Sequence, residues 1–184
     1  MASATKRNER WSMDFIHDSL CDKRKFKNLT IVDDYTKECP VILANTSITG
    51  NKVVQELDKL KEKVGLPEEI TVDNGPEFIS NALDKWAYLN GVRLYFIEPG
   101  KPTENPFIES FNGKFRDECL SMHWFLSIQH AKEVIEQWRI EYNTERPHSS
   151  LNYMTPSEFV AQLTEKIIEV PLENTNLQMA HTMG

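Results

Sequence analysis

Cysteine is scarce in this chain, and long apolar runs are absent. The three cysteines, Cys21, Cys39 and Cys119, are odd in number and scattered. They lack the paired spacing of a disulfide framework or a zinc site, so we expect them to be reduced and mostly structural. No apolar run approaches a membrane span, and the start MASATKRNER lacks the hydrophobic segment of a signal peptide. We therefore expect a cytoplasmic protein without a membrane partner.

An excess of positive charge is also missing. The chain has 21 Lys and Arg residues against 28 Asp and Glu residues, a formal net charge of −7. Domains that coat nucleic acid by bulk electrostatics are usually basic over one face, so this class is disfavoured. A metal-dependent nuclease stays open, because part of the acidity would form its metal site. Any DNA contact should be confined to local basic patches and depend strongly on salt. These patches are Lys6–Arg10, Lys23–Lys27, Lys101, Lys114 and Arg116.

Length and apolar content limit the number of domains. A chain of 184 residues with 40% hydrophobic residues suffices for one packed domain with a tail, and is too short for two ordinary ones. We divide it into an N-terminal extension (1–10), a core (11–163) and a C-terminal tail (164–184). The tail has few apolar residues at regular spacing.

The first part of the chain predicts three strands in an antiparallel meander. WSMDFIHD alternates between two different faces, which is the period of a strand. A charged turn, CDKRKFKN, leads to a second strand in LTIVDDYT, and ECPVILANT is the third. Asp14 lies at the centre of the first strand, among Trp and Phe residues that favour β-structure. A carboxylate in that setting needs a functional reason.

The pattern then alternates between helices and strands. Apolar residues recur at helical spacing from Ser47 or Thr49 to about residue 64, and EEITVD is a strand that ends at Asp73. A short helix over 80–90 and the strand VRLYFI follow. Strand, helix, strand, helix, strand is typical of parallel crossovers. Further helices are predicted over 127–142 and from residue 155.

Together these elements predict an α/β fold with a five-stranded mixed sheet, three strands antiparallel and two parallel, and helices on both faces. This layout resembles the ribonuclease H-like fold. In that fold, carboxylates from the first strand, the end of the fourth strand and a later helix converge. Fold alone does not give function, which depends on the site.

The stretch PFIESFNGKFRDE predicts a helix that holds a carboxylate beside the sheet. Asn105 is a good N-cap, and Pro106 fits the first helical position, where no N–H is needed. Glu109 therefore lies in the first two turns, and three residues share its polar face: Asn112, Gly113 and Arg116. The apolar stripe beside that face should dock onto the sheet. It consists of Phe107, Ile108, Phe111 and Phe115.

Asp14, Asp73 and Glu109 form the candidate site. Hard oxygen ligands of this kind hold Mg²⁺ or Mn²⁺, ions that also bind phosphate oxygens. Two such ions can serve in-line chemistry at a phosphodiester. Any one acid among 28 is more often a solvated surface group. Three independent placements at one sheet edge favour a metal site over that alternative.

Three stretches resemble the catalytic-core blocks of bacterial insertion-sequence transposases, which share the retroviral integrase core. They are WSMDF around Asp14, TVDNGPEF around Asp73 and PGKPTENPFIESFNGKFRDE around Glu109. The 35 residues between Asp73 and Glu109 match the D,D-35-E spacing of that superfamily. YNTERPHSSLNYMTPSEF resembles the segment that closes the core in the insertion-sequence branch. The match covers about Trp11 to Phe159.

The resemblance implies divalent-metal-dependent DNA strand cleavage and strand transfer, with the three acids as catalytic metal ligands and two ions bound when DNA is present. Related integrases contact DNA at positions three, four and seven after the glutamate. Here these positions are Asn112, Gly113 and Arg116. Because Gly113 has no side chain, we assign its contact to Lys114, and we add Lys101 as a further DNA contact.

The same resemblance implies partners. The DNA partners are the element ends and the target, and location at the nucleoid follows when the protein is bound to DNA. Related enzymes bridge two DNA ends as multimers, so a homo-oligomer is expected. Before Trp11 there is no room for the helix-turn-helix with which these enzymes find their ends, so that part is either separate or missing.

Two alternative functions stay open. One is a catalytically silent DNA-binding or interaction module that retains the fold. The other is a general nuclease of the same fold, which would degrade DNA without joining it. The first should bind without cutting, so nicking or joining of an oligonucleotide with Mn²⁺ separates the readings.

Several other residues have structural readings that we prefer. Asp33 and Asp34 follow an apolar strand and fit a strand end or turn, and His148 fits a turn better than a base. His17 and Asp18 are expected to be exposed near the end of a strand. Core packing is the expected role of three tryptophans: Trp86, Trp124 and Trp138.

Overall fold

A five-stranded mixed sheet forms the centre of the protein. A computed structural model describes residues 3–98 and 106–169, with the side chains of the last helix described up to Glu165. The strand order is β3-β2-β1-β4-β5. Strands β1 (Arg10–Ser19), β2 (Lys25–Asp33) and β3 (Val41–Asn45) are antiparallel, whereas β4 (Glu69–Val72) and β5 (Arg93–Phe96) run parallel to β1. The predicted meander and parallel crossovers are confirmed.

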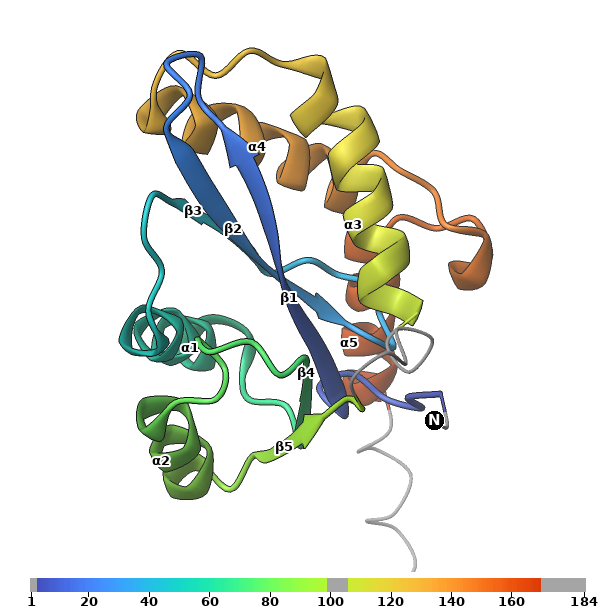
Figure 1. The fold of residues 1–184 in the computed structure, drawn as a ribbon. Helices are drawn as coiled ribbons and strands as arrows, with labels where there is room; N and C mark the ends of the chain where they lie inside the picture. The colour runs from blue at the N-terminus through green and yellow to red at the C-terminus, as the bar shows by residue number, and fades with distance from the viewer. Residues whose placement is uncertain (1–2, 99–105, 170–184) are drawn as a thin grey trace, which may run out of the picture.

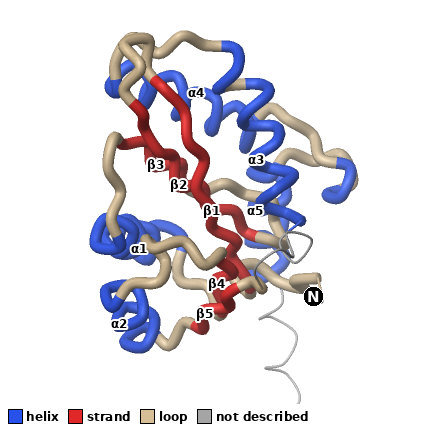
Figure 2. The backbone as a smooth tube through the Cα atoms, viewed as in Figure 1, coloured by secondary structure: helices blue, strands red, loops and turns tan. Residues whose placement is uncertain are grey.

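Helices cover both faces of this sheet (Figures 1 and 2). Helix α1 (Gly50–Val64) leads to β4, and α2 (Asn81–Asn90) joins β4 to β5. After β5 come α3 (Pro106–Glu118), the short 3₁₀ turn η2 (Leu120–Met122) and α4 (Ile128–Thr144). The turn η3 (Ser149–Leu151) and α5 (Pro156–Glu169) complete the described chain. The predicted order of elements is therefore correct.

The helix starts depend on local side-chain caps. Ser80 Oγ accepts a hydrogen bond from the Leu83 N–H at 3.3 Å, and Ser127 Oγ accepts one from His130 at 3.1 Å. Thr155 and Glu158 form a reciprocal capping box, with bonds of 3.2 and 2.8 Å. Each cap satisfies N–H groups that a helix start would leave unpaired.

Two apolar cores lie on opposite faces of the sheet. The core beneath α1 and α2 contains Trp11 and Met13 of β1. The core beneath α3 and α4 contains Ile16 of β1 together with the aromatic side chains of Phe111 and Trp138. Alternate residues of β1 therefore serve different cores, as the sequence pattern predicts. The face that holds α3 is the one toward which Asp14 is directed.

Two features differ from the sequence-based expectations. Trp124 is 85% exposed, so its predicted core position is wrong. Trp86 and Trp138 are buried, each with an exposed fraction of 5%. Trp124 lies in the short connection between η2 and α4, where no helix or strand covers it. Helix α5 continues to Glu169, past residue 163, where we predict the tail to begin. The helix formers of TEKIIE suffice to extend it.

The three cysteines are free thiols, as the sequence predicts. Cys39 and Cys119 are buried and Cys21 is exposed, and all three are free thiols. Burial raises the pKa of the Cys119 thiol to about 12, which favours an unreactive structural role. Within residues 3–98 and 106–169, no helix is both long and apolar enough to cross a membrane.

Candidate active site

Asp14 occupies the middle of β1 on the face that α3 covers. Its register partner across the antiparallel pair is Thr30 of β2. The Asp14 side chain is half-buried, and its carboxylate accepts a hydrogen bond from the Phe15 N–H at 2.7 Å. Because β1 is paired with β2 at this position, the backbone of Asp14 is fixed by the sheet.

Asp73 follows β4 directly and comes beside Asp14 through the parallel register. That register pairs Trp11 with Ile70 and Ser12 with Thr71, so two further residues along both strands Asp14 and Asp73 are level. Asp73 Oδ1 accepts a hydrogen bond from the Gly75 N–H at 2.9 Å. A Cβ at position 75 would lie 2.9 Å from that same oxygen, so a larger residue there would displace the Asp73 carboxylate from this position.

Glu109 lies in the first turn of α3, and apolar neighbours anchor it there. Ile108, Phe111 and Phe115 are buried against the sheet, as the predicted stripe requires. Glu109 itself is exposed, and no hydrogen bond to another described residue holds its carboxylate. Its backbone is therefore fixed while its side chain is free to change rotamer.

The charges of Asp73 and Glu109 act on Asp14. The pKa of Asp14 is raised to about 6. Burial is the main cause, the negative charges of Asp73 and Glu109 add to it, and hydrogen bonds from Phe15 and Asn112 oppose it. A charge interaction with both partners means that all three carboxylates share one region. Within the described part of the chain, however, no three His, Cys, Asp or Glu side chains lie close enough together to hold a metal ion as they stand.

Asn112 links Asp14 to β2. Its Nδ2 donates to Asp14 Oδ2 at 2.7 Å, and its Oδ1 accepts from the Thr30 hydroxyl at 2.9 Å. The Thr30 hydroxyl also lies 3.2 Å from the Asp14 carbonyl oxygen. Asn112 is buried, with an exposed fraction of 8%. The amide that we predict to contact DNA is therefore hydrogen-bonded within the protein. Thr30 was not found by sequence reasoning, since its role needs the β1–β2 register.

The remaining predicted DNA contacts differ in their placement. Lys114 and Arg116 are exposed on α3. Lys101, like the predicted N-cap Asn105, lies outside the described residues.

The residues to which we assign structural roles mostly have hydrogen-bond or ion-pair partners within the protein. Asp33 accepts N–H bonds from Tyr35 and Thr36 at 2.9 and 2.8 Å, which is a turn role. Asp34 forms a buried ion pair with Arg10 at 2.5 Å and accepts from the Ser12 hydroxyl. His148 is buried and organises the turn that contains η3 through backbone bonds. His17 is exposed on β1.

Sequence comparison with known families covers nearly all of the described chain. One profile described as an integrase core domain matches residues 4–102, and a second with the same description matches residues 90–156. The chain belongs to the integrase core family. The first match alone spans more than half of the sequence and includes both aspartates of the candidate site.

The relatives of this integrase core come from bacterial insertion elements. It is 54% identical over 155 residues to a 31.7 kDa protein of insertion element IS407 from Burkholderia multivorans, covering 84% of this chain and 56% of that protein. It is 49% identical over 154 residues to a protein of IS476 from Xanthomonas euvesicatoria, covering 84% and 44%. The chain thus spans about half the length of these relatives, and it is an integrase core of the insertion-sequence type.

The fold of this integrase core matches a retroviral counterpart. The catalytic core domain of HTLV-2 integrase, solved in complex with magnesium, superposes with a TM-score of 0.66 at 17% identity. The match covers 83% of this chain and 95% of that one. The predicted ribonuclease H-like fold is therefore confirmed.

Proposed function

We propose that this integrase core catalyses divalent-metal-dependent DNA strand cleavage and strand transfer. Asp14, Asp73 and Glu109 are the residues that we assign to holding two Mg²⁺ or Mn²⁺ ions. The observation that carries the proposal is the charge interaction of Asp14 with both other acids, which come from three separate elements. When bound, the ions supply activation of the attacking oxygen and neutralisation of charge at the leaving oxygen.

The donor set fits such ions. All three side chains are carboxylates, which are the hard oxygen ligands that Mg²⁺ and Mn²⁺ prefer. Like charges in one region raise a carboxyl pKa, as they do at Asp14, and a cation would reverse that effect. The Glu109 side chain is exposed, so it has room to change rotamer toward a bound ion.

The other residues of the site position these acids. Asn112 holds the Asp14 carboxylate through its amide, and Thr30 orients that amide. Gly75 fixes Asp73 through its N–H. The substrates in this proposal are two DNA molecules, the element end and the target. The freed 3′-hydroxyl of the first attacks a phosphodiester of the second, and the bridging 3′-oxygen of the attacked strand leaves.

The test is an oligonucleotide strand-transfer assay with Mn²⁺ on three variants, Asp14→Asn, Asp73→Asn and Glu109→Gln. Each removes one charge without changing side-chain size. We expect each to lower transfer at least about 1,000-fold, which corresponds to about 4 kcal/mol in the barrier. Asp117→Asn is the matched control, because Asp117 is an exposed acid on the same helix as Glu109. Full activity in any of the three variants would remove that residue from the site.

A catalytically silent DNA-binding module is the second candidate. It is favoured by the spacing of the acids, which do not form a three-ligand group in the described structure. The same assay separates the two functions, because a silent module binds DNA with Mn²⁺ present and yields neither nicked nor joined product. A general nuclease would give nicked product only.

Assembly belongs to the proposal as well. A transposase joins two element ends, so we propose that copies of this chain associate on DNA and that a separate helix-turn-helix part recognises the ends. Size-exclusion chromatography with light scattering, with and without an element-end duplex, tests the association. A protein that stays monomeric with the duplex would overturn it.

A further inference from the structure

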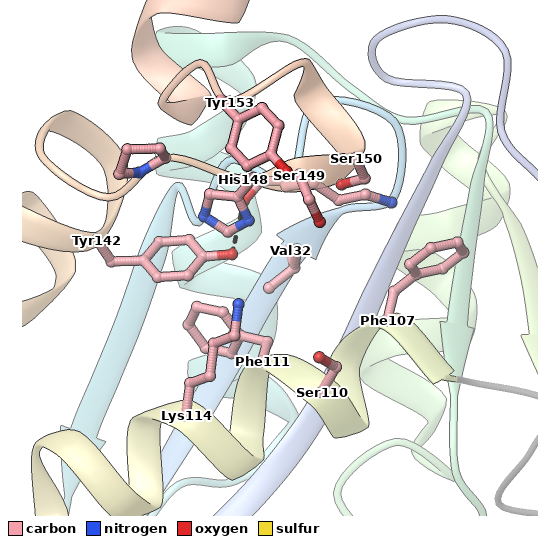
Figure 3. Close-up of a pocket in the computed structure, with 12 residues that line it drawn as sticks. Val32, Phe107, Ser110, Phe111, Lys114, Tyr142, His148, Ser149, Ser150 and Tyr153 are labelled. Atoms are coloured by element: carbon pink, nitrogen blue, oxygen red, sulfur yellow. Dashed lines mark hydrogen bonds between the residues drawn. The ribbon is translucent and has the colours of Figure 1, made fainter.

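A cavity separate from the three acids lies on the face of α3 that carries Ser110 and Lys114. It is a cavity of about 410 Å³ between α3, the end of α4 and the segment 147–153 (Figure 3). This volume falls within the range of about 300–1,000 Å³ that is typical of small-ligand sites. None of the described residues that line it is an Asp or a Glu. In a protein with a net charge of −7, a cavity whose described lining contains no carboxylate favours an anionic ligand.

Three cations act on this cavity, and they differ in how far acids compensate them. Arg146 is ion-paired with Glu118. Lys37 donates to the Asp34 carbonyl, lies 3.5 Å above the Phe107 ring, and interacts with the charges of Asp34 and Asp33. Lys114 has no hydrogen bond or ion pair with another described residue. Among the described residues, Lys114 therefore has no carboxylate partner.

His148 reports the positive field inside the cavity. Its ring is buried and packs edge-on against Tyr142, with centroids 5.0 Å apart. The pKa of His148 is lowered to about 4, mainly by burial and in addition by the charges of Lys114, Lys37 and Arg146. The ring is thus neutral at physiological pH and adds no charge of its own. Figure 3 shows the Lys114 side chain reaching from α3 toward this ring.

Hydroxyl groups complete the lining. Ser110 comes from α3, and Ser149, Ser150 and Tyr153 come from the 147–153 segment. The backbone of this segment is held in an unusual conformation, because Asn152 and Tyr153 have φ of 54° and 62°. A bulky residue in the left-handed region costs free energy. Such strained conformations are found most often at functional sites. Here the segment presents Tyr153 over the cavity, with the Tyr153 N–H bonded to the His148 carbonyl at 2.9 Å.

We propose that this cavity binds one phosphodiester group, with Lys114 as its charge partner and the serine and tyrosine hydroxyls as donors. One uncompensated positive charge matches the single negative charge of a phosphodiester better than the double charge of a phosphate monoester. Hydroxyls, a neutral imidazole and a lysine are common partners of phosphate oxygens. Where the phosphodiester belongs to a DNA strand, the inference rests on the proposed function. The site then holds the backbone on the opposite flank of α3 from the acids.

The test uses the whole chain in metal-free buffer with EDTA, so that the acidic site does not contribute. Dimethyl phosphate is the small probe, followed by amide shifts of residues 149–153 in ¹⁵N NMR spectra at constant ionic strength. A short DNA duplex is the second probe, followed by fluorescence anisotropy over a range of salt concentrations. The variants are Lys114→Gln and Ser150→Asp. Lys85→Gln is the matched control, because Lys85 is an exposed lysine on another helix, α2.

If the phosphodiester is part of DNA, Lys114→Gln should weaken duplex binding about three- to tenfold and reduce the salt slope by about one. Ser150→Asp should weaken it more, and Lys85→Gln should not change it. If dimethyl phosphate shifts the 149–153 amides in the wild type and not in Lys114→Gln, while duplex binding is equal in all variants, the cavity serves free phosphodiesters instead. Equal behaviour of all variants with both probes would overturn the site.

The failure of this site and the failure of the catalytic proposal give different results. Asp73→Asn should bind the duplex as the wild type does while losing transfer, whereas Lys114→Gln should bind the duplex about three- to tenfold more weakly. A failed transfer assay in the wild type, combined with the expected Lys114→Gln defect, would leave the phosphodiester site standing and reject the enzymatic function.

Discussion

Both faces of the central sheet bury an apolar core, but the face beneath α3 also buries polar side chains of the strands. Beneath α1 and α2 the strands contribute an apolar layer, including Met13, Leu29 and Ile31. Beneath α3 the same strands contribute polar groups in alternate positions, with Asp14 and Thr30 among them. A strand presents successive residues to opposite faces, so one strand can serve both purposes.

The difference separates stability from chemistry. Buried polar groups cost free energy unless they are hydrogen-bonded, and Thr71 on β4 has a buried hydroxyl without a partner among the described residues. The apolar face offsets such costs, because it fills its space with fully buried side chains. The α3 face can therefore hold three mutually repelling carboxylates without unfolding the sheet.

Truncation in the core beneath α1 and α2 should lower stability and leave the chemistry unchanged. Leu57 of α1 is fully buried, and Leu57→Ala should lower the free energy of unfolding by about 2–5 kcal/mol. Urea denaturation measures this change, with Leu89→Ala, at a residue 69% exposed on α2, as the control. Strand transfer per folded molecule should be unchanged at a temperature where the variant is folded. A loss of transfer without a loss of stability would contradict the separation of the two faces.

Truncation of Asn112 on the other face should act mainly on activity. Asn112→Ala removes the hydrogen bond that orients Asp14 and leaves the Thr30 hydroxyl with only its bond to the Asp14 carbonyl. We expect transfer to fall about 10- to 100-fold, as for other residues that orient a ligand. Asn90→Ala is the control, since Asn90 bonds only the Trp86 carbonyl and the Lys61 ammonium on the other side of the molecule. Transfer equal to that of the wild type would show that Asp14 needs no orientation.

The charge on Asp14 should make stability depend on pH. Its pKa is raised to about 6 in the folded protein from 3.8, so the folded state binds more protons between these values. Stability should then fall as pH rises from about 4 to above 6, and Asp14→Asn should lack this component. In EDTA at pH 7 the variant should be more stable than the wild type by on the order of 2 kcal/mol. Parallel stability curves against pH for the two proteins would refute the raised pKa.

Truncation of Trp138 should destabilise the protein far more than truncation of Trp124. Trp138 packs with Phe111 and Phe115 at centroid separations of 5.6 and 5.0 Å, so Trp138→Ala should cost about 3–5 kcal/mol. Trp124 is exposed, and Trp124→Ala should change stability by less than about 0.5 kcal/mol. Thermal unfolding by circular dichroism distinguishes the two. A comparable loss for both would mean that Trp124 is covered in solution.

Local signals in the sequence predict most of the fold. The alternation around Asp14 gives a two-faced strand, and caps such as Ser80 and Thr155 place helix starts, because these patterns depend on neighbours within a few residues. The exposure of Trp124 could not be predicted in the same way. An apolar side chain reads the same in sequence whether or not another element covers it.

The sequence by itself determined the family, the order of elements and the three candidate acids, because each depends on residue types at fixed spacing. Only the tertiary structure decided that Asn112 faces Asp14 rather than solvent, and that Lys37 and Lys114 line one cavity with the 147–153 segment. These relationships join residues 33 or more positions apart. They arise when β2, α3 and α4 pack, and no local pattern encodes such packing.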